Sequence, residues 1–260
     1  MDSAVVDSDA SLDPTRPRGR HANRSVAGTA GGNGSAGTLS IPRPELLPLP
    51  PVGTPYEHAQ GMAGRAAKRA FDLIGALLLL VILAPAWLFI AVAIKFDSTG
   101  PVLFRQRRIG RDGRAFRMLK FRTMVDGADE QKTTLLHLNE AAEGLFKINA
   151  DPRITSVGAW LRATCLDELP QLLNVITGQM SLVGPRPLVP EEDELITGED
   201  RRRLAMRPGM TGVWQVGGAS LIPIREMVRL DRGYLEDWSL WLDVKLLLLT
   251  ARYVILRKGV

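Results

Sequence analysis

An uncharged apolar run over residues 73–94 limits the possible folds of this chain more than any other feature. As a helix rising about 1.5 Å per residue, the run would reach roughly 33 Å, just enough to cross the hydrocarbon core of a bilayer. Pro85 lies in the middle of the run, where it removes one helical hydrogen bond and favours a kink. The run therefore predicts either a spanning helix or a helix that is broken near its centre.

Basic residues flank this run on both sides. Because cytoplasmic loops carry the excess of Lys and Arg, both ends of the run favour the same side of a membrane. A helix broken at Pro85 can enter a bilayer and return, although prolines are also tolerated in spanning helices. We therefore expect a re-entrant helix-break-helix anchored in one leaflet, with a plain spanning helix as the alternative. The flanking cations are Arg65, Lys68, Arg69, Lys95, Arg105, Arg107 and Arg108.

Composition limits the size of the domain and the kinds of partner that the chain can bind. Its 260 residues and 45% hydrophobic content suffice for one domain with appendages. The net charge of +5 suits either nucleic acid or anionic lipid, and the apolar run favours lipid, so we expect membrane lipid and no nucleic acid as a partner. A single cysteine, Cys165, excludes an internal disulfide. The first 30 residues contain no apolar segment, so no secretory signal is expected there.

Three segments are predicted along the chain. Residues 1–60 are rich in Pro, Gly and Ser and lack hydrophobic periodicity, which indicates a disordered tail. Residues 61–97 form the membrane segment, and residues 98–260 form a cytosolic domain. The predicted class is α+β: a membrane-anchored, re-entrant helix-break-helix followed by a mostly helical cytosolic domain with a small β-hairpin and interfacial amphipathic helices. Trp238, Trp241 and residues 245–257 are the expected interfacial contacts.

A β-hairpin is predicted where residues 102–109 and 114–121 flank a turn that contains Asp112 and Gly113. Residues 95–122 hold nine basic residues, and such density favours a collar that faces lipid headgroups. Residues 120–123 are expected to lie nearest to a substrate. A polar helix is predicted over residues 128–142.

Asp167 and Glu168 stand side by side before a predicted helix that Thr164 or Asp167 could cap and that ends at Gly178. Acidic residues at a helix start are ordinary caps. Alternatively, two adjacent carboxylates in unlike environments can divide the roles of nucleophile or metal ligand and proton handler. Spacing alone leaves both interpretations open.

Three cationic residues stand in sequence settings that suit phosphate. Arg186 lies between two prolines, and Arg207 precedes a proline and a glycine, so each guanidinium is presented by a stiff loop. Lys147 lies between two apolar residues and is either a surface lysine or a phosphate ligand.

Other chemistries have weaker support. With only three histidines, two of them in the tail, neither a histidine-dependent triad nor a histidine metal cluster is plausible. The sequence contains no Walker A motif. Adjacent carboxylates rarely reach the separation of about 5 Å that a glycoside hydrolase needs, so that activity ranks last.

Five motifs occur together in one order, between residue 120 and residue 212. In that order they resemble the bacterial sugar transferases, the monotopic polyprenyl-phosphate sugar-1-phosphate transferases or phosphoglycosyl transferases. The similarity extends from about Lys68 to the C-terminus. The motifs are KFRTM at 120–124, DPRIT at 151–155, LDELPQ at 166–171, LVGPRP at 182–187 and RPGMTG at 207–212.

The resemblance implies a reaction. Asp167 would attack the β-phosphate of a UDP-sugar, release UMP and carry the sugar phosphate on its carboxylate, from which undecaprenyl phosphate would take it. Glu168 would handle the proton or help Asp167 to hold Mg²⁺. Pro85 would break the membrane helix. The implied substrate-binding residues are Lys147 and Arg186, together with Arg122, Arg162 and Arg207, which would either face the nucleotide or support the fold.

The resemblance also implies a place and a role. The enzyme would lie in the bacterial inner membrane with its catalytic domain in the cytoplasm, and would start the assembly of an exopolysaccharide, capsule, O-antigen or glycoconjugate. Neither the sugar nor the oligomeric state follows, so a homo-oligomer stays open. The alternative function is a membrane-tethered binding protein for anionic lipid or nucleic acid, in which Asp167 and Glu168 only cap a helix.

Overall fold

The computed structural model describes residues 61–128, 130, 131, 135, 148, 151–216 and 223–256, with side chains through residue 254. The chain divides into two units, Met1–Ile41 and Pro42–Val260, and every described residue belongs to the second. Three expectations fall outside this part of the chain: the tail over residues 1–60, most of the helix over residues 128–142, and Lys147. The division into three segments stays a prediction.

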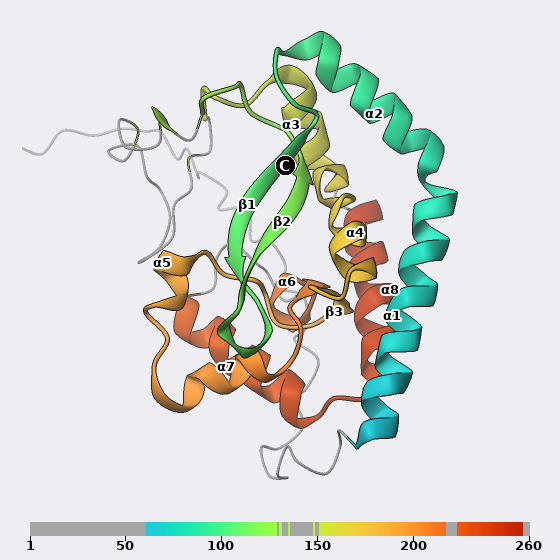
Figure 1. The fold of residues 1–260 in the computed structure, drawn as a ribbon, viewed down its shortest axis with the longest axis vertical. Helices are drawn as coiled ribbons and strands as arrows, with labels where there is room; N and C mark the ends of the chain where they lie inside the picture. Colours follow the sequence, from blue (N-terminus) through green and yellow to red (C-terminus); the bar gives the residue numbers. More distant parts are fainter. Residues whose placement is uncertain are drawn as a thin grey trace, which may run out of the picture. The chain divides into compact units, whose positions relative to one another are not determined.

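The apolar run forms two helices, α1 (Met62–Ile82) and α2 (Ala84–Asp97), which meet at a bend of 62° (Figure 1). Leu83 is the residue between them, and Pro85 lies in the first turn of α2, where its missing N–H needs no helical partner. The predicted break is confirmed, and it falls at Leu83, two residues before the proline. Among the described helices, none alone has the length and apolar character to cross a bilayer, whereas α1 and α2 taken together do.

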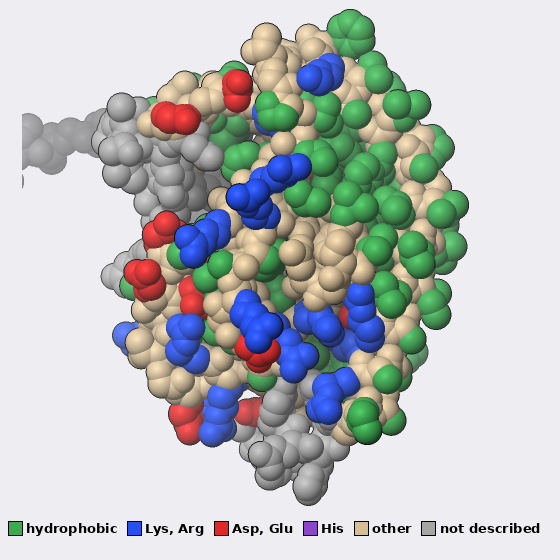
Figure 2. Space-filling view, viewed as in Figure 1, with side chains coloured by type: hydrophobic (Ala, Val, Ile, Leu, Met, Phe, Trp, Pro, Cys, Tyr) green, Lys and Arg blue, Asp and Glu red, His purple; other side chains and the backbone are tan. Residues whose placement is uncertain are grey.

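One side of the α1–α2 pair is open and apolar. Figure 2 shows these side chains as a continuous green region over α1 and α2. Ala76, Ile90 and Ile94 are instead buried against the rest of the protein. An exposed apolar surface of this kind is typical of a lipid or protein contact. The exposed residues include Ile74, Leu77, Leu78, Val81, Ile82, Leu88, Phe89 and Val92.

The predicted hairpin is confirmed. Strands β1 (Leu103–Ile109) and β2 (Ala115–Phe121) pair antiparallel, with Leu103 opposite Phe121 and Ile109 opposite Ala115. A single turn of 3₁₀ helix, η1 (Arg111–Gly113), joins them. Asp112 and Gly113 have φ of 56° and 73°, the left-handed region that Asp and Gly tolerate best.

The predicted capping of the helix before Gly178 is wrong. Helix α3 (Ser156–Ala163) is followed by a 3₁₀ turn, η3 (Leu166–Glu168), and only then by α4 (Gln171–Ile176). The residue that precedes α4 is Pro170, which makes no side-chain cap. Neither Asp167 nor Thr164 occupies that position, because the chain turns left-handed at Cys165 and restarts the helix after the proline.

A second, parallel sheet escaped the sequence analysis. Strand β3 (Ser181–Val183) pairs with β4 (Gly209–Thr211), and both strands are largely buried. Gly209 allows this pairing, because a Cβ there would lie 2.1 Å from the backbone nitrogen of Gly184. Between the strands lie α5 (Pro190–Asp193) and η4 (Gly198–Ala205), and α6 (Val213–Val216) follows β4.

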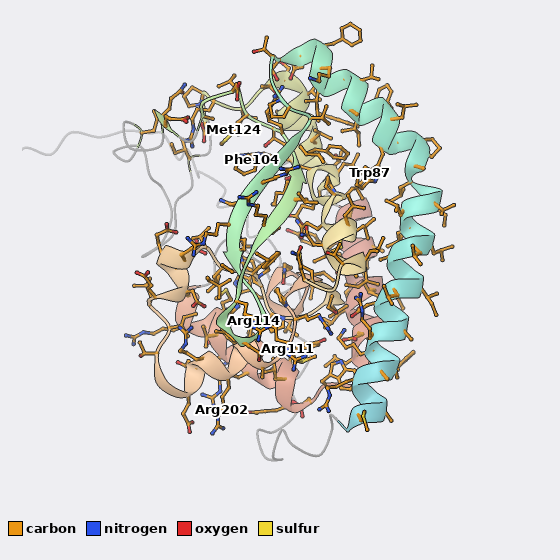
Figure 3. The ribbon with its side chains drawn as sticks, viewed as in Figure 1. Trp87, Phe104, Arg111, Arg114, Met124 and Arg202 are labelled. Carbon is orange, nitrogen blue, oxygen red and sulfur yellow. The ribbon has the colours of Figure 1, made fainter. Side chains whose placement is uncertain are left out.

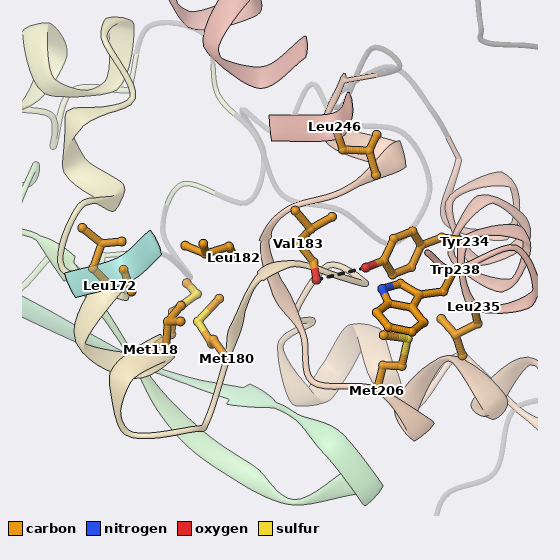
Figure 4. Close-up of a cluster of buried hydrophobic side chains, with 12 residues drawn as sticks. Met118, Leu172, Met180, Leu182, Val183, Met206, Tyr234, Leu235, Trp238 and Leu246 are labelled. Atoms are coloured by element: carbon orange, nitrogen blue, oxygen red, sulfur yellow. Dashed lines mark hydrogen bonds between the residues drawn. The ribbon is translucent and has the colours of Figure 1, made fainter. Parts of the chain in front are cut away.

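Two C-terminal helices, α7 (Ile224–Glu236) and α8 (Leu240–Leu256), complete the main core. Figure 4 shows this core, in which Tyr234 of α7 meets Val183 of β3, and Leu172 of α4 lies beside Met118 and Met180. Trp238 is 8% exposed and its Nε1 donates to Asp243, so its predicted interfacial role is wrong. Trp241 is 63% exposed, as an interfacial residue would be.

Buried charges fasten α1 to this core. Lys68 Nζ donates to Asp243 Oδ2 at 2.7 Å and lies 3.6 Å from Asp72 Oδ1. Asp72 in turn accepts from Ser181 Oγ at 2.9 Å and from the Leu182 backbone N–H at 3.1 Å. The apolar helix is therefore hydrogen-bonded to strand β3.

Candidate active site

Asp167 and Glu168 lie on a turn whose backbone is strained. Cys165 has φ of 56°, a conformation that costs a non-glycine residue free energy and that persists only where its surroundings enforce it. The turn exposes the two carboxylates unequally: the Asp167 side chain is 12% exposed and the Glu168 side chain 40%. The two neighbours therefore have unlike environments.

Lys120 joins the two carboxylates. Its Nζ donates to Glu168 Oε1 at 2.7 Å and lies 3.8 Å from Asp167 Oδ2. The next residue, Phe121, is buried and packs edge-on against Trp87 of α2, with ring centroids 5.2 Å apart. Because β2 is anchored on α2 in this way, its end holds Lys120 against η3.

The pKa values of the two carboxylates move in opposite directions. Burial raises the pKa of Asp167 above its ordinary value, and the charge of Glu168 adds to the rise, while Lys120 opposes it. Partial burial would also raise the pKa of Glu168, but the ion pair with Lys120 and the charges of Arg186 and Arg108 outweigh it, so that pKa is lowered. Two carboxylates whose pKa values are shifted in opposite directions can take different roles in one reaction.

Two arginines bring positive charge to Glu168. The Arg186 guanidinium lies over the Trp214 ring, 4.2 Å from its centroid, and makes no hydrogen bond to the residues that the structure describes. Arg108 is buried and donates to Gln106 Oε1 and to the Pro187 carbonyl. Burial, together with the charge of Arg186, lowers the pKa of Arg108 to about 10. The Arg186 guanidinium therefore suits the oxygens of a diphosphate, while Arg108 adds positive charge beside it.

A buried ion pair fixes the loop that carries Arg186. Arg203 donates to Asp231 Oδ2 from both Nε, at 3.0 Å, and Nη2, at 2.8 Å. The same guanidinium donates to the backbone carbonyl of Arg186. The backbone of Arg186 is thus fixed in place, while the N–H groups of its guanidinium remain able to donate to a ligand.

Arg162 is the predicted arginine that stays close to Asp167. Its Nε donates to Thr123 Oγ1 at 2.9 Å, at the end of the hairpin. Burial lowers the pKa of Arg162, and the nearby charge of Asp167 counteracts this effect. Arg162 therefore contributes positive charge beside the acidic pair.

Arg122 and Arg207 make contacts in other places. Arg122 Nη2 donates to the Ser98 carbonyl at 2.8 Å and to Ser98 Oγ at 2.9 Å, at the end of α2. Arg207 Nε donates to the Gly178 carbonyl at 2.7 Å, after α4. Of the five cations predicted to bind substrate, two lie near the acidic pair, two make these backbone contacts, and Lys147 lies outside the described residues.

The sequence analysis missed specific roles for Lys120 and Arg108. It placed residues 120–123 near a substrate and assigned Arg108 only to the lipid-facing collar. The hairpin register contained a usable signal, because Arg108 is opposite Phe116 and Lys120 opposite Phe104, on the face that also buries Met118. Cations on the buried face of a strand need partners, and here those partners form the site.

The acidic pair fits what Mg²⁺ requires from a protein. Mg²⁺ is usually bound by one or two carboxylates, keeps several waters and takes further oxygens from substrate phosphates. Asp167 and Glu168 provide two carboxylates, and Lys120 shows that a cation is stabilised between them. Within the described ranges no group of three or more His, Cys, Asp or Glu is arranged to hold a metal, so a phosphate ligand would have to complete this site.

Comparison with known proteins gives consistent matches over most of the chain. The galactosyl transferase CpsE of Streptococcus agalactiae serotype III (strain NEM316) is 44% identical over 74% of this chain. The exopolysaccharide production protein ExoY of Rhizobium meliloti (strain 1021) is 42% identical over 75% of it. The UDP-glucose:undecaprenyl-phosphate glucose-1-phosphate transferase of Escherichia coli (strain K12) is 39% identical over 77% of it.

These relatives differ in length. The matched part of this chain covers 88% of ExoY, but only 43% of CpsE and 43% of the Escherichia coli transferase. The family model described as bacterial sugar transferase matches residues 63–257, which include α1, the hairpin, the acidic pair and both arginine loops. The resemblance read from the motifs is therefore confirmed, and this chain belongs to the bacterial sugar transferase family.

Proposed function

We propose that this chain is a phosphoglycosyl transferase that moves a sugar 1-phosphate from a UDP-sugar to undecaprenyl phosphate and releases UMP. The observation that carries the proposal is the pair Asp167 and Glu168, unequally buried and joined by Lys120, with Arg186 and Arg108 beside it. The name of the Escherichia coli relative describes transfer of glucose 1-phosphate from UDP-glucose to the same lipid carrier.

Asp167 is the nucleophile in this proposal. A carboxylate oxygen attacks the β-phosphorus of the donor, the bond from that phosphorus to the bridging oxygen breaks, and UMP leaves with the electron pair. An oxygen of undecaprenyl phosphate then attacks the same phosphorus, which restores the Asp167 carboxylate and forms the diphosphate-linked sugar. The raised pKa of Asp167 supports the choice, because a more basic carboxylate is a better nucleophile.

The neighbouring residues stabilise charge in both steps. Lys120 holds Glu168 as an anion, Arg186 would bind the oxygens of the diphosphate, and buried Arg108 adds positive charge beside Arg186. Mg²⁺, held by Asp167 and Glu168, would supply the Lewis acidity that offsets the negative charge of the phosphates. Arg162 helps to keep Asp167 anionic.

The proposed location follows from the lipid acceptor. The apolar face of the bent α1–α2 pair enters one leaflet of the bacterial inner membrane, with the acidic pair on the cytoplasmic side, where UDP-sugars are available. The lipid phosphate then lies at the interface, within reach of the site. The names of the relatives further support a role at the start of exopolysaccharide assembly.

The decisive experiment is UMP release from a panel of UDP-sugars by the full chain in detergent, with undecaprenyl phosphate and Mg²⁺. Asp167→Asn should lower the rate by at least about 10³-fold, as removal of a nucleophile does in other enzymes. Asp200→Asn is the matched control, because Asp200 is half-exposed in a surface ion pair and should leave the rate unchanged.

Equal rates in wild type and Asp167→Asn would remove Asp167 from the mechanism. No release by folded wild-type protein with any donor would favour the membrane-tethered binding protein. That alternative explained the acidic pair as a helix cap, but neither Asp167 nor Glu168 caps α4.

A further inference from the structure

A second cationic site lies at the tip of the hairpin, away from the acidic pair. A pocket of about 370 Å³ opens between this tip and the end of α4. Its lining includes Arg111, Arg114, Phe116, Gly178, Gln179 and Arg207. Arg114 is six residues from Lys120 along β2, which corresponds to about 20 Å of strand. The pocket therefore does not belong to the proposed catalytic site.

Positive charge gathers around this pocket. Burial lowers the pKa of Arg207, and the charges of Arg69 and Arg111 lower it further. Arg69 reaches the region from α1, and its Nη2 would lie 3.5 Å from a Cβ at Gly178. The carboxylate of Asp112, 3.4 Å from Arg111 and 56% exposed, compensates only part of this charge.

Helix capping explains two of these arginines. Arg69 donates to the carbonyls of Val175 and Ile176 at the end of α4, and Arg207 donates to that of Gly178. Carbonyls at the end of a helix attract cations, so these contacts are structural.

Arg111 and Arg114 have no such explanation. Figure 3 shows both side chains at the hairpin tip, close to each other. Arg114 makes no ion pair or hydrogen bond through its side chain within the part of the chain that the structure describes, and Arg111 pairs only with Asp112 next to it. Like charges held at a pocket repel one another unless an anion joins them, and guanidiniums bind phosphate in particular.

The position of the pocket indicates where such a phosphate comes from. Arg69 precedes Ile74, from which exposed apolar side chains recur along α1, by five residues, or about 7.5 Å of helix. In Figure 2 the blue cluster of this region borders the green surface of α1. If that surface enters lipid, the pocket lies at the level of the headgroups, whose negative charge attracts nearby arginines.

We propose that the pocket formed by the hairpin tip, Gln179 and Arg207 binds a phosphate ester, with Arg111 and Arg114 as its main ligands. The position beside α1 favours the phosphodiester of an anionic phospholipid over a soluble phosphate. The proposal does not depend on the transferase activity.

The test measures ligand binding to the full chain in a zwitterionic detergent, from the rise of the thermal unfolding midpoint with ligand concentration. The probes are dihexanoylphosphatidylglycerol, dihexanoylphosphatidylcholine, inorganic phosphate and UMP. R111Q/R114Q removes the two proposed ligands. R202Q/R229Q is the matched control, because it removes the same charge from exposed surface ion pairs whose arginines do not line the pocket.

Wild type and R202Q/R229Q should bind phosphatidylglycerol saturably, and R111Q/R114Q should bind it at least about tenfold more weakly, since two charge-assisted contacts are lost. Phosphatidylcholine should not bind. If the affinity for phosphate or UMP falls in R111Q/R114Q in the same way, the pocket is a phosphate site, but its ligand is a soluble phosphate.

Equal affinity in R111Q/R114Q and R202Q/R229Q would overturn the proposal, as would the lack of saturable binding by every probe. Both double variants should unfold at the wild-type temperature without ligand, which shows that the hairpin is intact. Asp167→Asn should bind the probe like wild type, so failure of the proposed transferase function would leave this result unaffected.

Discussion

Replacing Lys120 by glutamine tests whether the ammonium group controls the ionisation of the acidic pair. The substitution removes one positive charge that lies 2.7 Å from Glu168 and 3.8 Å from Asp167. Even with the dielectric constant of water, the most screened case, these attractions amount to about 1.5 and about 1.1 kcal/mol. A free energy of about 1.4 kcal/mol moves the midpoint of a titration by about one pH unit.

The direction of the change follows from the charge. Lys120 lowers the pKa of both carboxylates, so its loss raises both values. Activity that needs anionic carboxylates is present above their pKa and disappears as the pH falls through it. In Lys120→Gln the acid limb of the pH profile should therefore lie about one unit higher than in wild type.

The assay is kcat/KM for UMP release as a function of pH, which reports the ionisation of the free enzyme. Lys120→Arg keeps the charge and should restore most of the wild-type limb. Arg105→Gln removes an exposed charge from the neighbouring strand and should move the limb very little, because solvent screens it. An acid limb that stays in place in Lys120→Gln, or moves to lower pH, would refute the electrostatic argument.

Three substitutions test stability, measured as the free energy of unfolding in detergent. Asp243→Asn should lower it by about 3–5 kcal/mol, because Lys68 stays buried after losing the closer of its two carboxylates; a loss below about 1 kcal/mol would contradict this. Gly158→Ala should cost roughly 1–3 kcal/mol, because the added Cβ would lie 2.0 Å from the Thr123 carbonyl oxygen. Gly233→Ala, in the middle of α7 with open space around it, should instead gain about 1 kcal/mol, and a loss there would refute the steric reasoning.

Features that depend on local chemistry were predictable from the sequence. The hairpin turn follows from Asp112 and Gly113, because these residue types accept the positive φ that both adopt. The break in the apolar run follows from Pro85, although it falls at Leu83, two residues before the proline. The motifs were sufficient to identify the family.

Features that depend on distant contacts were not predictable. Strands β3 and β4 have three residues each and are separated by α5 and η4, so neither shows a periodicity that predicts their pairing. Tryptophan is a residue type typical of membrane interfaces, but Trp238 is buried in the core and donates a hydrogen bond to Asp243.

The acidic pair shows the same limit at the site itself. The positive φ of Cys165 is enforced by its surroundings and has no sequence signal, yet it separates Asp167 from the start of α4. Arg186 and Arg207 look alike in sequence, each beside a proline. Tertiary contacts distinguish them: Arg186 lies over the Trp214 ring with Glu168 nearby, whereas Arg207 donates to the Gly178 carbonyl.

The hydrogen bonds between Asp72 and strand β3 have a practical consequence for anyone who wants this protein without detergent. Deleting the apolar helices would remove Asp72, the hydrogen-bond partner of Ser181 and Leu182. It would also expose the surface where Leu182 packs on Gly75. A water-soluble version should therefore keep both helices and exchange only their outward side chains, such as Ile74 and Val81, for polar ones.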